Sequence, residues 1–223
     1  KREEIFRQEG WNYHLEQKEG PLKYNGVVYN EMKGAFSSPD EVLEREIMNH
    51  LFPDTTYGCE SGGDPKNIPD LTYENFLNFH RTYYHPSNSY IYLYGNMDME
   101  EKLAFLDEHY LSHFDYLDVD SVIQEQKAFG ACQDVTLEYP VAENEGEEDN
   151  TYLSYNMVVG NAADSQMAMA FEVLDYALLS APGAPLKQAL LDVKAGKDVY
   201  GSYDDGILQP YFTVIAKGSN PDR

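Results

Sequence analysis

The order of amphipathic helical segments and short apolar runs constrains the fold of this chain more than any other feature. Ser38, Pro39 and Glu41 give a helix start, with a capping box and proline at the first helical position. Similar signals predict further helices, and β-branched or alternating runs predict strands between them. The expected helices cover residues 4–11, 38–51, 72–84, 98–114, 165–179 and 185–196, and the expected strands cover 89–94, 135–139, 151–159 and 211–216. This order predicts an α+β fold in which helices cover one face of a sheet.

The length and the charge pattern suggest how the chain is divided. It has 223 residues, of which 42% are hydrophobic, and this is enough for one or two domains. After residue 114 the sequence turns acidic and loop-like, so we expect a linker at residues 121–132. One α+β unit is then expected over residues 1–120 and another over residues 133–223. The acidic run at 143–149 is predicted to be a solvated hairpin tip, since its spacing is not that of a calcium-binding EF-hand.

The net charge limits the classes of partner. With 39 acidic and 16 basic residues the chain carries a formal charge of −23. We therefore expect no binding to nucleic acid or to anionic membranes, because both need basic patches. The field favours basic peptides over acidic ones, although solubility alone also accounts for such a charge. The sequence has no apolar run long enough to cross a bilayer. Two cysteines, Cys59 and Cys132, form no disulfide framework and favour a reducing compartment such as the cytoplasm, with an organelle matrix as the alternative.

Glu31 is the main candidate for chemistry. It follows the apolar run 26–29, which is interpreted as a short strand, and it precedes the helix start at residue 38. A carboxylate at a strand-to-helix passage can face a site without being buried unpaired, although this spacing alone is more typical of an ordinary solvated glutamate. Asn30 and Lys33 are the neighbours that could orient this carboxylate by hydrogen bonding, but a charged Lys33 would also repel any cation close to it.

Other polar clusters give weaker candidates. His109 and His113 lie four residues apart on a predicted helix and could share a metal, but their acidic neighbours also suit a solvated surface. His80 and His85 have a predicted helix end between them, which is poor geometry for chelation. The loop at 61–64 could hold an anion through backbone amides, but it lacks the lysine of a phosphate loop and is interpreted as structural.

Several long sequence motifs occur in a fixed order along nearly the whole chain. They are GVVYNEMKG at 26–34, TYGCESGGDP at 56–65, FHRTYYHPSN at 79–88, YLYGN at 92–96, LSYNMVVG at 153–160, LDYALL at 174–179, APLKQAL at 184–190 and LQPYFTV at 208–214. Together they resemble the presequence-protease and falcilysin branch of the pitrilysin (insulinase) family of zinc metallopeptidases. A series of long motifs in a fixed order is far more specific than one short motif.

The resemblance implies a fold, a metal and a reaction. The implied fold is that of mitochondrial-processing-peptidase-like units, in which helices pack on mostly antiparallel sheets. This chain would hold the later part of one unit and the first part of the next. In the family, zinc is bound by the two histidines of a His-x-x-Glu-His motif and by a later glutamate, which matches Glu31. The inner glutamate of that motif is the general base, and a three-ligand site leaves one position for water.

The sequence departs from the family at one point, because it contains no His-x-x-Glu-His motif. We expect the chain to be an internal piece of a longer zinc endopeptidase that degrades unfolded oligopeptides, with the histidines and the general base upstream. The piece itself is then expected to contain no catalytic residue and to be inactive. The alternative is a non-catalytic scaffold or partner subunit of the same fold. In either case sheet edges are expected to be exposed, so the chain could self-associate.

Overall fold

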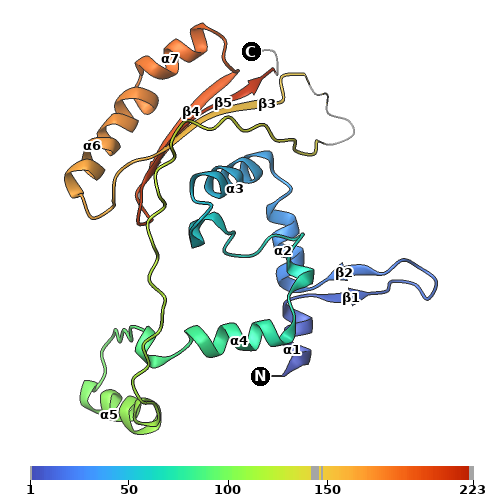
Figure 1. Ribbon diagram of the computed structural model, residues 1–223, viewed down its shortest axis with the longest axis vertical. Coiled ribbons are helices and arrows are strands. Elements are labelled where there is room, and N and C mark those ends of the chain that lie inside the picture. Colours follow the sequence, from blue (N-terminus) through green and yellow to red (C-terminus); the bar gives the residue numbers. More distant parts are fainter. Residues whose placement is uncertain (1, 142–145, 147, 221–223) are drawn as a thin grey trace. The chain divides into compact units, whose positions relative to one another are not determined.

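The structure is a computed structural model that describes residues 2–141, 146 and 148–220 (Figure 1). The chain forms two compact units. The first comprises Lys1–Gly34 and Gly62–Val122, and the second comprises Ala35–Ser61 and Ile123–Arg223. Helices are combined with antiparallel strands, so the predicted α+β class is confirmed. Within the described residues, none of the helices is both long and apolar enough to cross a membrane.

The first unit consists mainly of helices and one hairpin. Its elements are α1 (Glu3–Glu9), β1 (Asn12–His14), β2 (Lys23–Asn25), α2 (Val27–Ala35), η2 (Ile68–Asp70), α4 (Tyr73–Tyr83), η3 (Pro86–Asn88), α5 (Met99–His109) and η4 (Leu111–His113). The strands β1 and β2 pair antiparallel with Tyr13 opposite Tyr24. A small core of Phe6, Trp11 and Ile68 joins α1 to η2.

The second unit is built around a three-stranded antiparallel sheet in the order β3-β5-β4. Its elements are α3 (Pro39–Leu51), η1 (Thr56–Gly58), β3 (Thr151–Val158), α6 (Ser165–Asp175), the π-helical turn η5 (Tyr176–Ser180), α7 (Pro185–Asp192), β4 (Asp198–Asp204) and β5 (Tyr211–Ser219). The central strand β5 is largely buried along its length because both of its faces are covered.

Alternation along β5 sends its side chains into two separate cores. Phe212 and Ala216 pack with Leu179 of η5 on the face that α6 and α7 cover. Tyr211 and Ile215 point to the other face and pack against α3. Figure 1 shows α3 on one side of the sheet and α6 and α7 on the other. The expectation that helices cover only one face is therefore wrong for this unit.

Most predicted helices are present at their expected positions, whereas the strand predictions are less accurate. The strands at 151–159 and 211–216 correspond to β3 and β5. No strand is assigned at 89–94 or at 135–139, and β1, β2 and β4 were not expected. The side chain of Ser38 makes no capping hydrogen bond, so the predicted capping box of α3 is not formed. The acidic run at 143–149 lies largely outside the described residues.

The division into compact units differs from the expected one at a single segment. Residues 35–61, which the sequence placed with the first unit, group with the second. The physical reason is α3, whose Ile47 packs with Tyr211 and Ile215 of β5. The chain passes from the first unit to the second between Val122 and Ile123, and both residues lie within the expected linker at 121–132.

Candidate functional site

Glu31 lies within helix α2, so the expected strand at residues 26–29 is wrong. Gly26 has a φ of +147° and is buried, and a side chain there would collide with the backbone of Gly10 and Trp11. The Gly10 carbonyl accepts a hydrogen bond from the Tyr29 amide at 3.3 Å. The chain therefore turns tightly at Gly26 and enters a helix in spite of two consecutive valines.

Two faces of α2 have different surroundings. Tyr29 and Met32 are half-buried and pack against the core of Phe6, Trp11 and Ile68. Glu31 lies on the exposed side, and helical spacing places it beside Val27 and Val28, which are also exposed. Within the described residues its carboxylate makes no hydrogen bond and no ion pair. The core thus anchors the helix, and the carboxylate is left available on its outer face.

The structure does not bring the two proposed orienting residues to Glu31. The Asn30 amide nitrogen donates a hydrogen bond to Asn25 Oδ1 at 2.8 Å, which ties α2 to the end of β2. Lys33 is exposed and has no hydrogen bond or ion pair within the part of the chain that the structure describes.

The remaining polar candidates do not assemble into a metal site. His109 ends α5 and His113 lies in η4, so the two are not on one continuous helix as expected. The His85 ring accepts a hydrogen bond from the Ser87 amide at 3.2 Å, in agreement with a structural role in the turn. Among the described residues no three His, Cys, Asp or Glu side chains form a group that could hold a metal ion.

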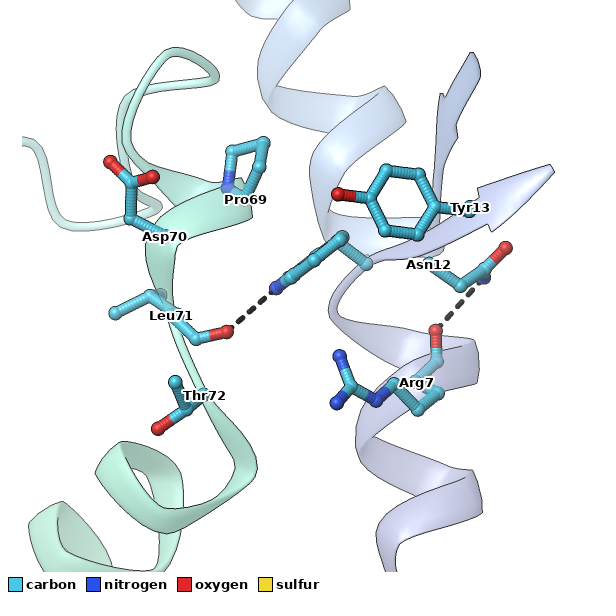
Figure 2. A pocket seen from close by; sticks show the side chains of 8 residues that line it. Arg7, Asn12, Tyr13, Pro69, Asp70, Leu71 and Thr72 are labelled. Atoms are coloured by element: carbon cyan, nitrogen blue, oxygen red, sulfur yellow. Dashed lines mark hydrogen bonds between the residues drawn. The ribbon is translucent and has the colours of Figure 1, made fainter. Parts of the chain in front are cut away.

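A cavity of about 360 Å³ lies in the first unit, and Glu31 is not among the residues that line it. Figure 2 shows Arg7, Asn12 and Tyr13 on one side of it and the segment Pro69–Thr72 on the other. The Trp11 indole Nε1 donates a hydrogen bond to the Leu71 carbonyl at 2.8 Å. The Arg7 guanidinium lies 5.4 Å from the Trp11 ring centroid. On the hairpin, the neighbouring Tyr13 raises the pKa of Tyr24. The cavity is separate from the Glu31 face and sequence reasoning did not identify it.

Comparison with known families and proteins identifies the chain. The family profile described as "Peptidase M16 inactive domain" matches residues 70–223, more than half of the sequence. The chain belongs to the M16 peptidase family. This confirms the family resemblance that the sequence motifs from residues 26–34 onward indicated. Glu31 precedes the matched segment, so the word "inactive" in the description refers to a part of the chain that does not contain it.

Individual relatives match almost the whole chain. It is 52% identical over 223 residues to Protein HypA of Clostridium perfringens, covering 100% of this chain and 23% of that protein. It is 40% identical over 222 residues to Presequence protease 1, chloroplastic/mitochondrial, of Arabidopsis thaliana, covering 98% of this chain and 20% of the relative. The chain thus spans only about a fifth to a quarter of the length of these proteins.

A solved structure supports the fold. A crystal structure of an M16-like peptidase from Alicyclobacillus acidocaldarius matches 88% of this chain and 46% of its own, with a TM-score of 0.51 and 18% sequence identity. At that identity the likeness bears on the fold alone. The names of plant and animal relatives include mitochondria and chloroplasts, and the cytoplasmic expectation finds no support in them.

Proposed function

We propose that this chain is part of a zinc-dependent M16 endopeptidase that degrades unfolded oligopeptides, and that Glu31 is one carboxylate ligand of the metal. The observation that carries the proposal is the side chain of Glu31, exposed on α2 and without a partner in the described part of the chain. Carboxylate oxygens are common zinc ligands, and an unpaired carboxylate has its lone pairs available for a cation.

The chain supplies a rigid support for that ligand. Tyr29 and Met32 anchor α2 in the small core, so the backbone that carries Glu31 is fixed by packing. Bound zinc would lower the pKa of its water toward neutrality and polarise the peptide carbonyl. The other ligands and the general base are proposed to come from a different part of the parent polypeptide. The 223-residue chain alone is accordingly proposed to be inactive, and its charge of −23 favours positively charged peptides as substrates of the parent.

The test is the substitution Glu31→Gln in the full-length parent protein. The amide keeps the size of the side chain but loses the charge, so bound zinc, measured by metal analysis of the purified protein, should fall well below one per molecule. Peptidase activity should drop by more than about 100-fold. Glu100→Gln is the matched control, since Glu100 is an exposed glutamate of α5. Full zinc content and full activity in Glu31→Gln would refute the assignment.

A scaffold role is the second candidate, and the absence of a His-x-x-Glu-His motif from this sequence favours it. Under that proposal the parent protein binds no zinc, and Glu31 has no catalytic partner. The same metal analysis separates the two functions, because a scaffold contains no stoichiometric zinc before any substitution. A parent protein with one zinc per molecule excludes the scaffold role.

A further inference from the structure

The cavity of the first unit lies beside an unpaired strand edge. Strand β1 contributes Asn12 and Tyr13 to its wall. Because consecutive residues of a strand point to opposite faces, a cavity that touches both must lie along the edge of β1 and not over one face. That edge is free, since β1 pairs with β2 alone and residues 12–14 make no further backbone hydrogen bond within the described residues. Backbone groups along it are available to another extended chain.

The opposite wall of the cavity is also extended backbone. Leu71 has φ and ψ of −72° and 130°, and Thr72 has −99° and 160°. The Trp11 indole joins the two walls through its hydrogen bond to the Leu71 carbonyl. Figure 2 shows the walls facing each other across the cavity. The cavity is therefore a slot between two extended segments, and this shape suits an extended peptide more than a helix.

The polar side chains of the walls are paired within the protein. The Arg7 guanidinium donates a hydrogen bond to Glu3 Oε1 at 3.1 Å, and the Asn12 amide nitrogen donates one to the Arg7 carbonyl at 2.9 Å. The Thr72 hydroxyl donates a hydrogen bond to Asn75 Oδ1 at 2.7 Å. A polar ligand group would have to replace one of these hydrogen bonds, so the walls give little advantage to a charged or polar ligand.

The remaining surface of the cavity is mostly carbon. Trp11, Tyr13, Pro69 and Leu71 supply it. Asp70 is exposed, and Figure 2 shows its carboxylate directed away from Tyr13. A cavity with paired polar side chains and an open carbon surface favours an apolar ligand. Its volume of about 360 Å³ lies near the lower end for ligand pockets, so it suits one large side chain.

Two aromatic rings shape the wall for an aromatic ligand. The ring centroids of Trp11 and Tyr13 are 5.5 Å apart, and the ring planes make an angle of 86°. Rings at right angles form a corner in which a third ring can lie face-on to one and edge-on to the other. Trp11 is 8% exposed and is fixed by the core, whereas Tyr13 is 61% exposed and is backed by the Tyr24 ring at 5.5 Å. One side of the corner is thus rigid, and the other is open to solvent.

We propose that this cavity binds an aromatic side chain of an unfolded peptide, with the peptide backbone along the free edge of β1. The proposal rests on the proposed peptidase function and adds an anchoring site for its substrate that is separate from Glu31. Unfolded peptides expose the large aromatic side chains that folded proteins bury. The charge of −23 adds an attraction for peptides that carry lysine or arginine. The preferred ligand is accordingly a basic peptide with an aromatic residue.

Two other occupants compete with a peptide. A second copy of the chain also carries a charge of −23, so repulsion between the copies opposes its binding. The parent polypeptide is the other competitor, and if it covers the cavity the full-length protein has no open site. The three occupants predict different binding results, which the following measurements separate.

Trp11 fluorescence tests the proposal directly, because Trp11 is the single tryptophan of the 223-residue chain and forms a wall of the cavity. The probes are a ten-residue peptide of glycine, serine and lysine with one central phenylalanine, and the same peptide with alanine at that position. The phenylalanine peptide should change the Trp11 emission and bind at least about tenfold more tightly than the alanine peptide. Equal binding of the two peptides, or binding of neither, would overturn the proposal.

Tyrosine variants locate the binding site. Tyr13→Ala removes one ring of the corner, so it should lower the affinity for the phenylalanine peptide by about fivefold or more. Tyr13→Phe keeps the ring and should keep the affinity. Tyr116→Ala is the matched control, since Tyr116 is 83% exposed in the same unit but does not line the cavity. Equal losses in Tyr13→Ala and Tyr116→Ala, or a loss in neither, would show that the peptide binds elsewhere.

The full-length parent decides between the occupants. Fluorescence anisotropy of the labelled peptides, measured with EDTA to prevent zinc-dependent cleavage, should show the same preference for phenylalanine. A preference that is lost in the parent would mean that its own polypeptide fills the cavity. Peptide affinity that falls as the concentration of the 223-residue chain rises would assign the cavity to a second copy, and either result overturns the proposal. Glu31→Gln should leave the preference unchanged, so failure of the zinc assignment and failure of this site give different results.

Discussion

In the second unit, the side chain of Asp40 makes hydrogen bonds to residues of all three strands of the sheet. Its carboxylate, near the start of α3, accepts hydrogen bonds from Lys217 Nζ at 2.8 Å, Tyr200 Oη at 2.8 Å and Tyr152 Oη at 3.5 Å. The three donors come from β5, β4 and β3, so one side chain joins α3 to every strand of the sheet. The hydrogen bond from Lys217 is the main reason why the pKa of Asp40 lies below its usual value.

Asp40→Asn should lower the free energy of unfolding at pH 7 by about 1–2 kcal/mol, because the group is charged but half-exposed. A pKa that is lower in the folded chain adds stability above the unfolded value of about 3.9, and that stability is lost as the pH falls through the folded pKa. The difference between variant and native chain should therefore shrink below about pH 4. Urea titrations at several pH values measure this difference in the free energy of unfolding. Asp134→Asn, in an exposed coil segment, is the control. A pH-independent difference would contradict the ionic origin.

The sequence identified Glu31 but not the conformation that carries it. Val27 and Val28 favour a strand, and the actual helix follows from the close approach of Gly26 to Gly10 and from the packing of Tyr29 and Met32. Those contacts join residues from separate elements, so tertiary packing overrides the local preference. The three donors to Asp40 could not be predicted either, since they lie more than 100 residues away in the chain.

At the level of elements, helices could be predicted because their start signals are local. The Thr72 side chain accepts a hydrogen bond from the Asn75 amide at 3.1 Å, and Asn75 Oδ1 accepts one from the Thr72 amide at 2.9 Å, which makes a complete capping box for α4. Strands β1, β2 and β4 contain asparagine, lysine, aspartate or glycine and have low strand propensity. They form because a partner strand is adjacent, which is information that a local window does not contain.

Thr72→Ala should destabilise the first unit by about 1 kcal/mol, because it leaves the Asn75 amide without its cap. Trp11 is the single tryptophan and its indole contacts Leu71, so its fluorescence reports on this region during urea unfolding. Thr82→Ala in the same helix is the matched control. Its hydroxyl donates to the Asn78 carbonyl within the helix at 2.9 Å, and alanine there should be neutral or slightly stabilising. Equal losses in both variants would show that the cap makes no specific contribution.

At the scale of the whole molecule, the buried surface is divided unevenly. Of the 13 buried hydrophobic side chains among the described residues, three belong to the first unit, and the others belong to the second. The second unit has helices on both faces of its sheet, and Gln126 is buried there, where its side chain accepts a hydrogen bond from the Asp54 amide at 2.9 Å. The edges of β3 and β4 are unpaired in the described sheet, so self-association of the isolated chain stays a prediction.

The uneven division predicts that the 223-residue chain does not unfold in one step. Trp11 fluorescence follows the first unit, whereas far-ultraviolet circular dichroism follows the helices and strands of both units. The fluorescence midpoint in urea should lie about 1 M or more below the main circular-dichroism midpoint, since the unit with less buried apolar surface loses its stability first. Coincident transitions would mean that the two units unfold cooperatively, and the first unit would then draw stability from contacts beyond its own core.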